Sequence, residues 1–268
     1  MTSVATLRAL ADRLIVAERE RKPVTPLSAG EELSIGDAYE IQRLTAQSRV
    51  ERGDAIRGHK IGLTAKVMRE YFRVSEPDYG HLFASMFIAN KSTLDLSALI
   101  DPQIEVEPAF ILKSRLRGPG VARDDVLAAT EWIVPSFEII DSRIVDWTIK
   151  LQDTVADNGS SALVVLGEAR IRPQDLPLDR LDTRLLLDGA VVERGNTSAI
   201  LGHPAEGVAW LANAVGAHGV SLEAGHVLLP GTATRSHRVA GHQTARAEID
   251  GLGTVELRFA NRPAVVRS

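Results

Sequence analysis

Cysteine is absent from the 268 residues, so disulfide bonds, thiol nucleophiles and zinc–thiolate sites are excluded. No apolar run reaches the roughly 18–20 residues that span a bilayer, which argues against a membrane as partner. Residues 1–22 carry acidic side chains and lack the apolar core of a secretory signal. These absences predict a soluble protein of the cytoplasm.

Aromatic residues are scarce at 4%, so the core must come mainly from Leu, Val, Ile and Ala, within a hydrophobic fraction of 44%. The net charge is −4 and no basic stripe is present, which excludes nucleic acid as an expected partner. The patterns GxGxxG, GxxxxGK[ST] and GxSxG do not occur. A dinucleotide fold, a P-loop and a nucleophile elbow therefore have no support.

The first 56 residues predict a helical N-terminal region. Apolar residues from Val4 to Val16 recur near a 3.6-residue period, and Lys22-Pro23 ends that pattern. A second helix is expected from after Ser34 to near Gly53.

Beyond residue 56, strands dominate, and 57–268 is expected to form a β-rich catalytic domain. The expected strands are 56–62, 103–112, 134–140, 162–166, 184–193, 226–229 and 254–260. The expected helices are 65–72, 123–131 and 205–218. Because helices and strands do not alternate strictly, the pattern predicts an α+β fold and not a doubly wound sheet.

Two glutamates lie two positions apart in the expected strand 103–112. Glu105 and Glu107 share a face there, roughly 6.5–7 Å apart, while Ile104 and Val106 face the opposite side. The face is either solvated and acidic or directed into a pocket that holds a hard divalent cation.

A third carboxylate, Glu138, lies inside an apolar run. If buried, it must be neutralised, paired or bound to metal. An ion pair with Arg143, a position at a sheet edge, and a metal site all satisfy this requirement.

Lys60 lies on the apolar strand 56–62, and Asp78 follows it in the segment EPDYG at 76–80. Lys60 is either a lysine whose ammonium reaches solvent or a desolvated cation facing an anionic substrate. Asp78 alone is typical of a turn former.

The segment DTVADNGSS at 153–161 is compatible with a capped turn before a strand, or with a loop offering hydroxyls and amides to a small anion. The sequence pattern leaves both interpretations open.

Taken together, a set of segments spanning about residues 7–260 resembles the hydratase/decarboxylase branch of the fumarylacetoacetate hydrolase superfamily. The segments are DAYEIQ at 37–42, GHKIGLTAK at 58–66, EPDYGHL at 76–82, IEVEPAFIL at 104–112, SFEIIDSRI at 136–144, DTVADNGSS at 153–161, GHPAEGVAWLAN at 202–213 and LGTVELRF at 252–259. The resemblance implies a mixed β-roll or barrel-like core around a metal, with helices at the N-terminus.

The resemblance also implies roles for individual residues. Glu105, Glu107 and Glu138 would bind Mg²⁺ or Mn²⁺, and Lys60 and Asp78 would transfer protons. The expected substrate-binding residues are Leu63, Ser160, Thr234 and Arg235. The segment GTATRSH at 231–237 is similar to the hydratase pattern SGSFTRP but differs from it around the expected pocket.

The implied activity is metal-dependent hydration of a 2-hydroxy-2,4-dienoate to a 4-hydroxy-2-oxo acid, as in aromatic meta-cleavage catabolism. One alternative is decarboxylation of a 4-oxalocrotonate-like 2-oxo-3-enedioate, with Arg235 and His237 as cations for a second carboxylate. Another is a non-catalytic protein that binds 2-oxo acids or acts as a pathway scaffold. A homo-oligomer and a neighbouring pathway enzyme as partner are also implied.

Overall fold

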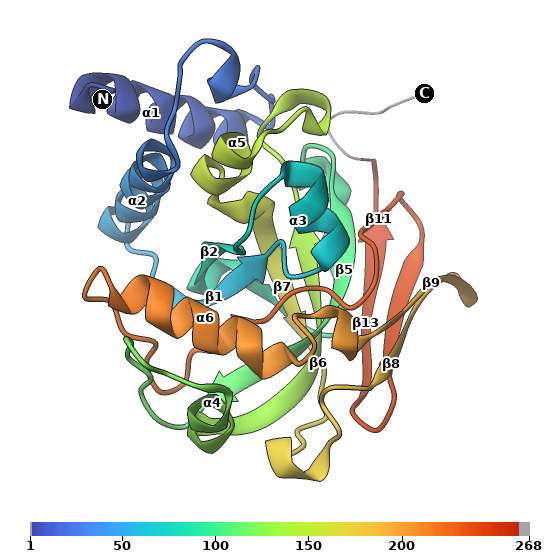
Figure 1. Cartoon of the computed structure of the whole chain (residues 1–268). Helices are drawn as coiled ribbons and strands as arrows, with labels where there is room; N and C mark the ends of the chain where they lie inside the picture. Colours follow the sequence, from blue (N-terminus) through green and yellow to red (C-terminus); the bar gives the residue numbers. More distant parts are fainter. Residues whose placement is uncertain (1, 263–268) are drawn as a thin grey trace.

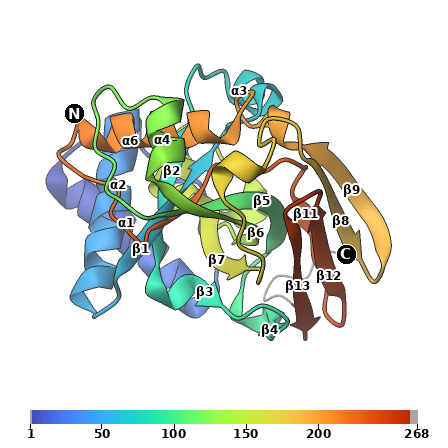
Figure 2. The same ribbon diagram turned by 90° about the horizontal axis from the view of Figure 1, so that it is seen from below.

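A computed structural model describes residues 2–262, and its core lies between two curved β-sheets (Figures 1 and 2). The larger sheet has the order β2 (Asp78–Phe83), β1 (Ile56–Gly62), β10 (Val227–Leu229), β5 (Gln103–Leu112), β6 (Thr130–Ile140), β7 (Ser161–Leu166) and β3 (Phe87–Ile88), with β11 (His237–Arg238) also paired to β5. The smaller sheet has the order β4 (Thr93–Asp95), β13 (Gly253–Ala260), β12 (Thr244–Ile249), β8 (Asp182–Leu187) and β9 (Ala190–Asn196). The mixed α+β class and the curled, barrel-like sheet are confirmed.

Helices surround the larger sheet. They are α1 (Val4–Glu20), α2 (Ile35–Glu51), α3 (Lys66–Phe72), α4 (Arg123–Ala129), α5 (Leu151–Ala156) and α6 (Pro204–Gly216). None of the helices in the described part of the chain is long and apolar enough to cross a membrane.

The main core forms where the two sheets face each other. Alternation along β5 sends Ile104 and Val106, both fully buried, into this core together with Phe137 of β6 and Leu257 of β13. The opposite face of β5 is thereby free to carry the glutamates. The two-residue period of β5 thus produces both the apolar face that packs between the sheets and the opposite face that carries the glutamates.

The two N-terminal helices form where they are expected. Ser34 begins α2 with a capping box in which its side chain accepts from the Asp37 backbone N–H and Asp37 accepts in return. The buried leucines of α1 and Ile41 of α2 share a second apolar cluster with Ile144 and Val155. This cluster packs the two helices directly against the β-rich part of the chain. The division of the chain into two regions at residue 56 stays a prediction.

The prediction of one continuous strand over 184–193 is wrong. Asp188 and Gly189 both adopt positive φ, 50° and 82°, and form the two-residue turn between β8 and β9. The strands β2 and β12 were not expected. β2 begins at Asp78, so the EPDYG segment runs from a turn directly into a strand.

Candidate active site

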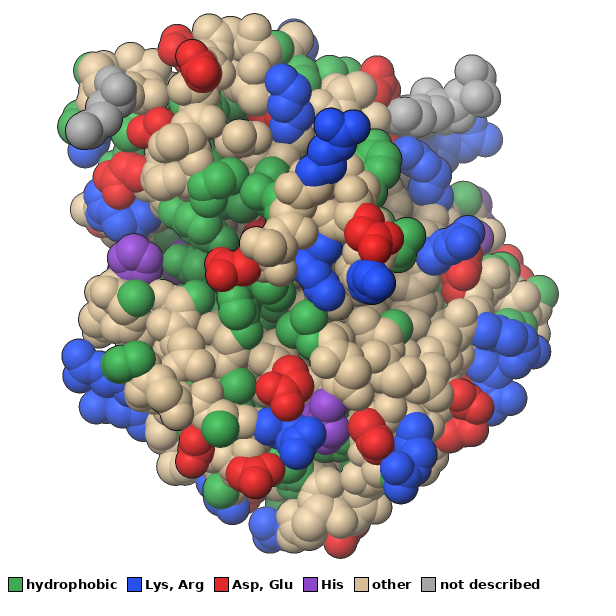
Figure 3. All heavy atoms as spheres, in the orientation of Figure 1, with side chains coloured by type: hydrophobic (Ala, Val, Ile, Leu, Met, Phe, Trp, Pro, Cys, Tyr) green, Lys and Arg blue, Asp and Glu red, His purple; other side chains and the backbone are tan. Residues whose placement is uncertain are grey.

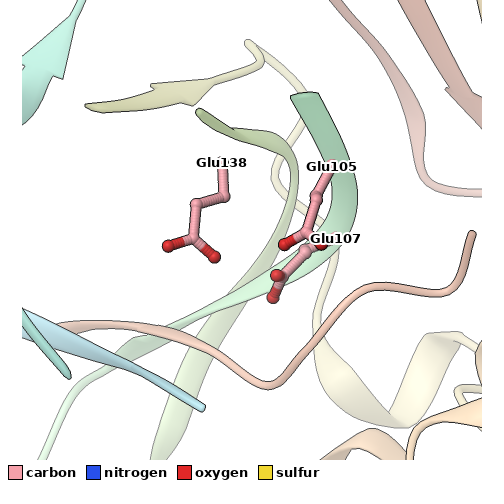
Figure 4. A group of neighbouring side chains, drawn as sticks. All are labelled: Glu105, Glu107 and Glu138. Atoms are coloured by element: carbon pink, nitrogen blue, oxygen red, sulfur yellow. The ribbon is translucent and has the colours of Figure 1, made fainter. Parts of the chain in front are cut away.

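Three carboxylates converge on one face of the larger sheet (Figure 4). Glu105 and Glu107 project from the same face of β5, and Glu105 lies directly opposite Glu138 on β6 in the strand register. Each of the three offers a carboxylate oxygen within 4.8 Å of the others. The sequence pattern left open that this face of β5 is acidic and solvated. That interpretation is wrong, because Glu107 and Glu138 are buried.

Hydrogen bonds compensate little of the burial of these carboxylates. Among the described residues, neither carboxylate oxygen of Glu138 has a hydrogen-bond partner, and Glu107 accepts one bond, from the Gly231 backbone N–H at 2.8 Å. Burial raises the pKa of Glu105 to about 7, with Lys60 opposing the rise. Burial and the neighbouring Glu138 hold the pKa of Glu107 well above its usual range.

This donor set fits a hard divalent cation. All three side chains offer oxygen, the ligand atom that Mg²⁺ and Mn²⁺ prefer. A buried carboxylate without partners is costly unless a positive charge compensates it. A divalent cation held by Glu105, Glu107 and Glu138 would supply that charge.

Lys60 is buried beside the carboxylates. Its Nζ lies 3.5 Å from Glu138 Oε2, so the ammonium does not reach solvent. Burial alone would lower the pKa of Lys60, but the surrounding carboxylates, led by Glu138, raise it above its ordinary value. The lysine therefore provides a fixed positive charge at this point. Glu138 does not pair with Arg143, which instead binds Asp157.

Asp78 completes the charged group from the neighbouring strand β2, where it lies opposite Gly62 of β1. A Cβ on Gly62 would lie 2.1 Å from Asp78 Oδ1, so only glycine leaves room for this carboxylate. Asp78 Oδ1 has no hydrogen-bond partner, and burial raises the Asp78 pKa while Lys60 lowers it in part. Asp78 is thus a buried acid and not an exposed turn residue.

Asp78 also lines a second hollow on the outer side of β2. This groove lies among α2, α5 and α6 and is lined by Tyr39, Tyr79, Leu151 and Trp210 among others. Figure 3 shows hydrophobic side chains gathered in a hollow on this face, with charged side chains around it.

The loop that carries Ser160 is held by a dense hydrogen-bond network. It forms the single turn η5 (Asn158–Ser160), which follows α5. The Asn158 side chain both accepts from the His81 backbone N–H at 2.7 Å and donates to the His81 carbonyl at 2.9 Å. The Arg143 guanidinium donates to Asp157 and to backbone carbonyls around it. These bonds fix Ser160 relative to Asp78 of β2.

A cavity of about 190 Å³ brings most of these groups together. Its wall includes Lys60, Leu63, Asp78, Glu105 and Ser160 from the predicted set. Thr234 and Arg235 do not line it, and Arg235 is exposed, so their substrate-binding role stays a prediction without support from the cavity. From the same segment, Thr232 and Ser236 line the wall instead.

Several wall residues were missed by sequence reasoning. They are Gln103, Ile140, Trp147, Ile149, Met68 and Phe72. The two-residue period that placed Glu105 and Glu107 together also places Gln103 on their face, so Gln103 had a usable signal. The apolar residues had none, because nothing in the sequence distinguishes them from core residues.

Comparison with known proteins gives consistent results. A family model described as fumarylacetoacetate (FAA) hydrolase C-terminal matches residues 50–260. The chain is 42% identical over 250 residues to a 2-hydroxyhexa-2,4-dienoate hydratase from Comamonas testosteroni, covering 92% of this chain and 95% of that protein. It is 43% identical over 214 residues to a 2-hydroxypent-2,4-dienoate hydratase from Pseudomonas putida, covering 79% and 96%.

Among solved structures, a 4-oxalocrotonate decarboxylase from Pseudomonas putida G7, complexed with magnesium and adipate, superposes with a TM-score of 0.93. It is 32% identical and the match covers 97% of this chain and 99% of that chain. The same enzyme has also been solved with calcium and acetate.

Proposed function

Because the chain belongs to the fumarylacetoacetate hydrolase C-terminal family, we propose that it is a metal-dependent hydratase. It would add water to a 2-hydroxy-2,4-dienoate and release a 4-hydroxy-2-oxo acid. The observation that carries this proposal is the position of Lys60, Asp78 and Glu105 on the wall of one cavity, with Glu107 and Glu138 clustered beside Glu105. Relatives named as hydratases of 2-hydroxydienoates, 42% and 43% identical, support the same reaction.

The cation held by Glu105, Glu107 and Glu138 would be Mg²⁺ or Mn²⁺. When bound, such an ion supplies Lewis-acid stabilisation of negative charge on the 2-oxygen of the substrate. The decarboxylase that is 32% identical was solved with magnesium, which supports a divalent ion here.

The side chains around the cavity would transfer the protons and stabilise the developing charge. The enol O–H proton must leave and C5 must gain a proton; water then adds its oxygen at C4 and a proton is delivered to C3. Asp78 is a buried carboxyl whose pKa is raised by burial, and it is our candidate for carrying a proton to the substrate. The Lys60 ammonium, 3.5 Å from Glu138, is placed to stabilise the enolate charge that develops at the 2-oxygen.

Ser160 and Thr232 complete the polar end of the cavity. Both lie on its wall, and Ser160 is almost fully buried. The Ser160 hydroxyl is suited to hydrogen-bond the substrate carboxylate and fix its orientation, which lowers the entropic part of the barrier. The Thr232 hydroxyl already donates to the backbone carbonyls of Val106 and Thr234 and contributes a polar wall there.

Decarboxylation is the competing reaction, and the structure offers it less support. A dicarboxylate substrate needs a second cation in the cavity, yet neither Arg235 nor His237 lines the wall. His237 Nδ1 instead lies 3.7 Å from Glu193. A non-catalytic binding or scaffold role is also disfavoured, because Glu105, Glu107, Glu138, Lys60 and Asp78 are all present.

The test offers the Mg²⁺-loaded protein two substrates, 2-hydroxypenta-2,4-dienoate and 2-oxohex-3-enedioate. Loss of substrate absorbance, water gain by mass and CO₂ release are recorded for both. Hydration of the first substrate without CO₂ release supports the proposal. CO₂ release from the second without hydration of the first replaces it with decarboxylation, and no turnover of either supports the non-catalytic role.

A homo-oligomeric assembly, a neighbouring enzyme of the same pathway as partner and a location in the cytoplasm belong to this proposal. The first two are expectations from the family resemblance. Light scattering of the purified protein tests the first of them.

A further inference from the structure

The cavity extends away from the carboxylates along β5 and β6. Gln103 lies opposite Ile140 in the strand register, two residues beyond the Glu105–Glu138 pair and on the same face. Two residues along a strand span roughly 7 Å. This direction therefore leads from the metal-binding end, where the substrate carboxylate and 2-oxygen would lie, toward the distal carbons of the substrate.

The far end of the cavity is lined mainly by apolar side chains. Ile140, Trp147 and Ile149 come from β6 and the segment after it, and Met68 and Phe72 come from α3. The Trp147 indole N–H donates to the Asp101 carbonyl at 3.1 Å, which places the tryptophan near the start of β5 and uses its only polar group. What remains exposed to the cavity is the aromatic surface.

No described cation faces this apolar end. Among residues 2–262, Lys60 is the one basic residue on the cavity wall, and its ammonium lies beside Glu138. Arg69 of α3 points to the backbone and donates to the carbonyls of Leu63 and Thr64 at 2.9 and 2.6 Å. Gln103 Oε1 accepts a bond from the Ser236 hydroxyl at 2.7 Å, which leaves the Gln103 amide N–H groups as donors that carry no positive charge.

We propose that the cavity selects substrates whose C5 carries an uncharged apolar substituent, an alkyl or aryl group, and rejects a distal carboxylate. This specificity rests on the proposed function, because it uses the same cavity and the same substrate orientation. A carboxylate against Ile140, Ile149 and Phe72 would lose part of its hydration to apolar contacts without gaining a counter-ion, which is costly. An alkyl group there gains free energy with each carbon removed from water.

The test measures binding without turnover, by calorimetry of the Mn²⁺-loaded protein with saturated 2-oxo acids that cannot be hydrated. The compounds are 2-oxobutanoate, 2-oxohexanoate and 2-oxoadipate, the last two having the same chain length. At about 0.8 kcal/mol for each buried CH₂, 2-oxohexanoate should bind about tenfold more tightly than 2-oxobutanoate. It should also bind at least about tenfold more tightly than 2-oxoadipate. Equal or tighter binding of 2-oxoadipate overturns the proposal.

Two pairs of variants on α3 test the location of the selection. Phe72→Ala should reduce the preference for 2-oxohexanoate over 2-oxobutanoate, whereas the matched control Tyr71→Ala, at a highly exposed neighbour, should not. Met68→Arg should shift the preference toward 2-oxoadipate, whereas Val67→Arg, also on α3 but outside the cavity wall, should not. Equal effects of each variant and its control contradict the assignment.

The hydration assay keeps the two proposals apart. If the binding order holds but none of the corresponding dienoates is hydrated, the proposed reaction fails and the apolar selection stands. If hydration occurs fastest with a dicarboxylic dienoate, the reaction stands and the selection fails.

Discussion

Replacing Glu105 with glutamine should stabilise the metal-free protein at alkaline pH. The pKa of Glu105 in the folded chain is raised from 4.5 to about 7, chiefly by burial. Between these values the folded state binds more protons than the unfolded state, so stability falls as pH rises through this window. At ~1.4 kcal/mol per pKa unit, the ionised carboxylate costs at most about 3 kcal/mol above pH 7.

Glu105→Gln removes that cost without changing side-chain shape. In EDTA at pH 8 the variant should unfold at higher urea concentration than the wild type, with a gain of up to about 3 kcal/mol. Below pH 4.5 the two proteins should have similar stabilities. Added Mn²⁺ should stabilise the wild type and affect the variant much less, because a ligand that binds only the folded state raises its stability.

The assay is urea denaturation followed by circular dichroism at pH 4.5 and pH 8, with EDTA or with Mn²⁺. Glu31→Gln, at an exposed carboxylate, is the matched control and should shift neither the pH dependence nor the metal response. A Glu105→Gln protein that is less stable than the wild type at pH 8 in EDTA would refute the reasoning. In that case the ionised Glu105 carboxylate would stabilise the fold by itself, without a bound cation.

Three further variants test the architecture of the site. Gly62→Ala places a Cβ 2.1 Å from Asp78 Oδ1 and should lower kcat/KM roughly 100-fold by displacing the Asp78 carboxylate. Calorimetry should show that the variant still binds Mn²⁺. Unchanged kinetics would contradict the role of Asp78. Asn158→Ala removes both hydrogen bonds to the His81 backbone and should cost about 2 kcal/mol in urea unfolding; no loss would mean that this clamp contributes nothing to stability. Phe137→Ala empties a fully buried site between the sheets and should cost about 3–5 kcal/mol; a loss under 1 kcal/mol would show that the core collapses around it.

The sequence predicted the elements that carry the site better than the elements that surround it. Strands β5 and β6 have long apolar runs, and the two-residue spacing of the glutamates in β5 put Glu105 and Glu107 on one face. The pairing of Glu105 with Glu138 depends on strand register, which local pattern does not determine. Here the family resemblance supplied what spacing alone left open.

The missed features depend on long-range packing or on turn geometry. The Asp188-Gly189 turn divides a continuous apolar run, and the Asp-Gly pair was the available signal. Met68 and Trp147 reach the cavity only because α3 and the segment after β6 fold over it. Arg235 was predicted at the substrate because of its motif, yet it lies exposed outside the wall.

The most direct test of the carboxylate site is the mass of the product formed from 2-hydroxypenta-2,4-dienoate by metal-stripped protein before and after addition of Mg²⁺ or Mn²⁺. The wild type should form a product of the substrate mass plus one water only with metal, and Glu138→Gln, folded by circular dichroism, should form none. Hydration by metal-stripped wild type, or full activity of Glu138→Gln, would contradict the central claim that these carboxylates hold the catalytic cation.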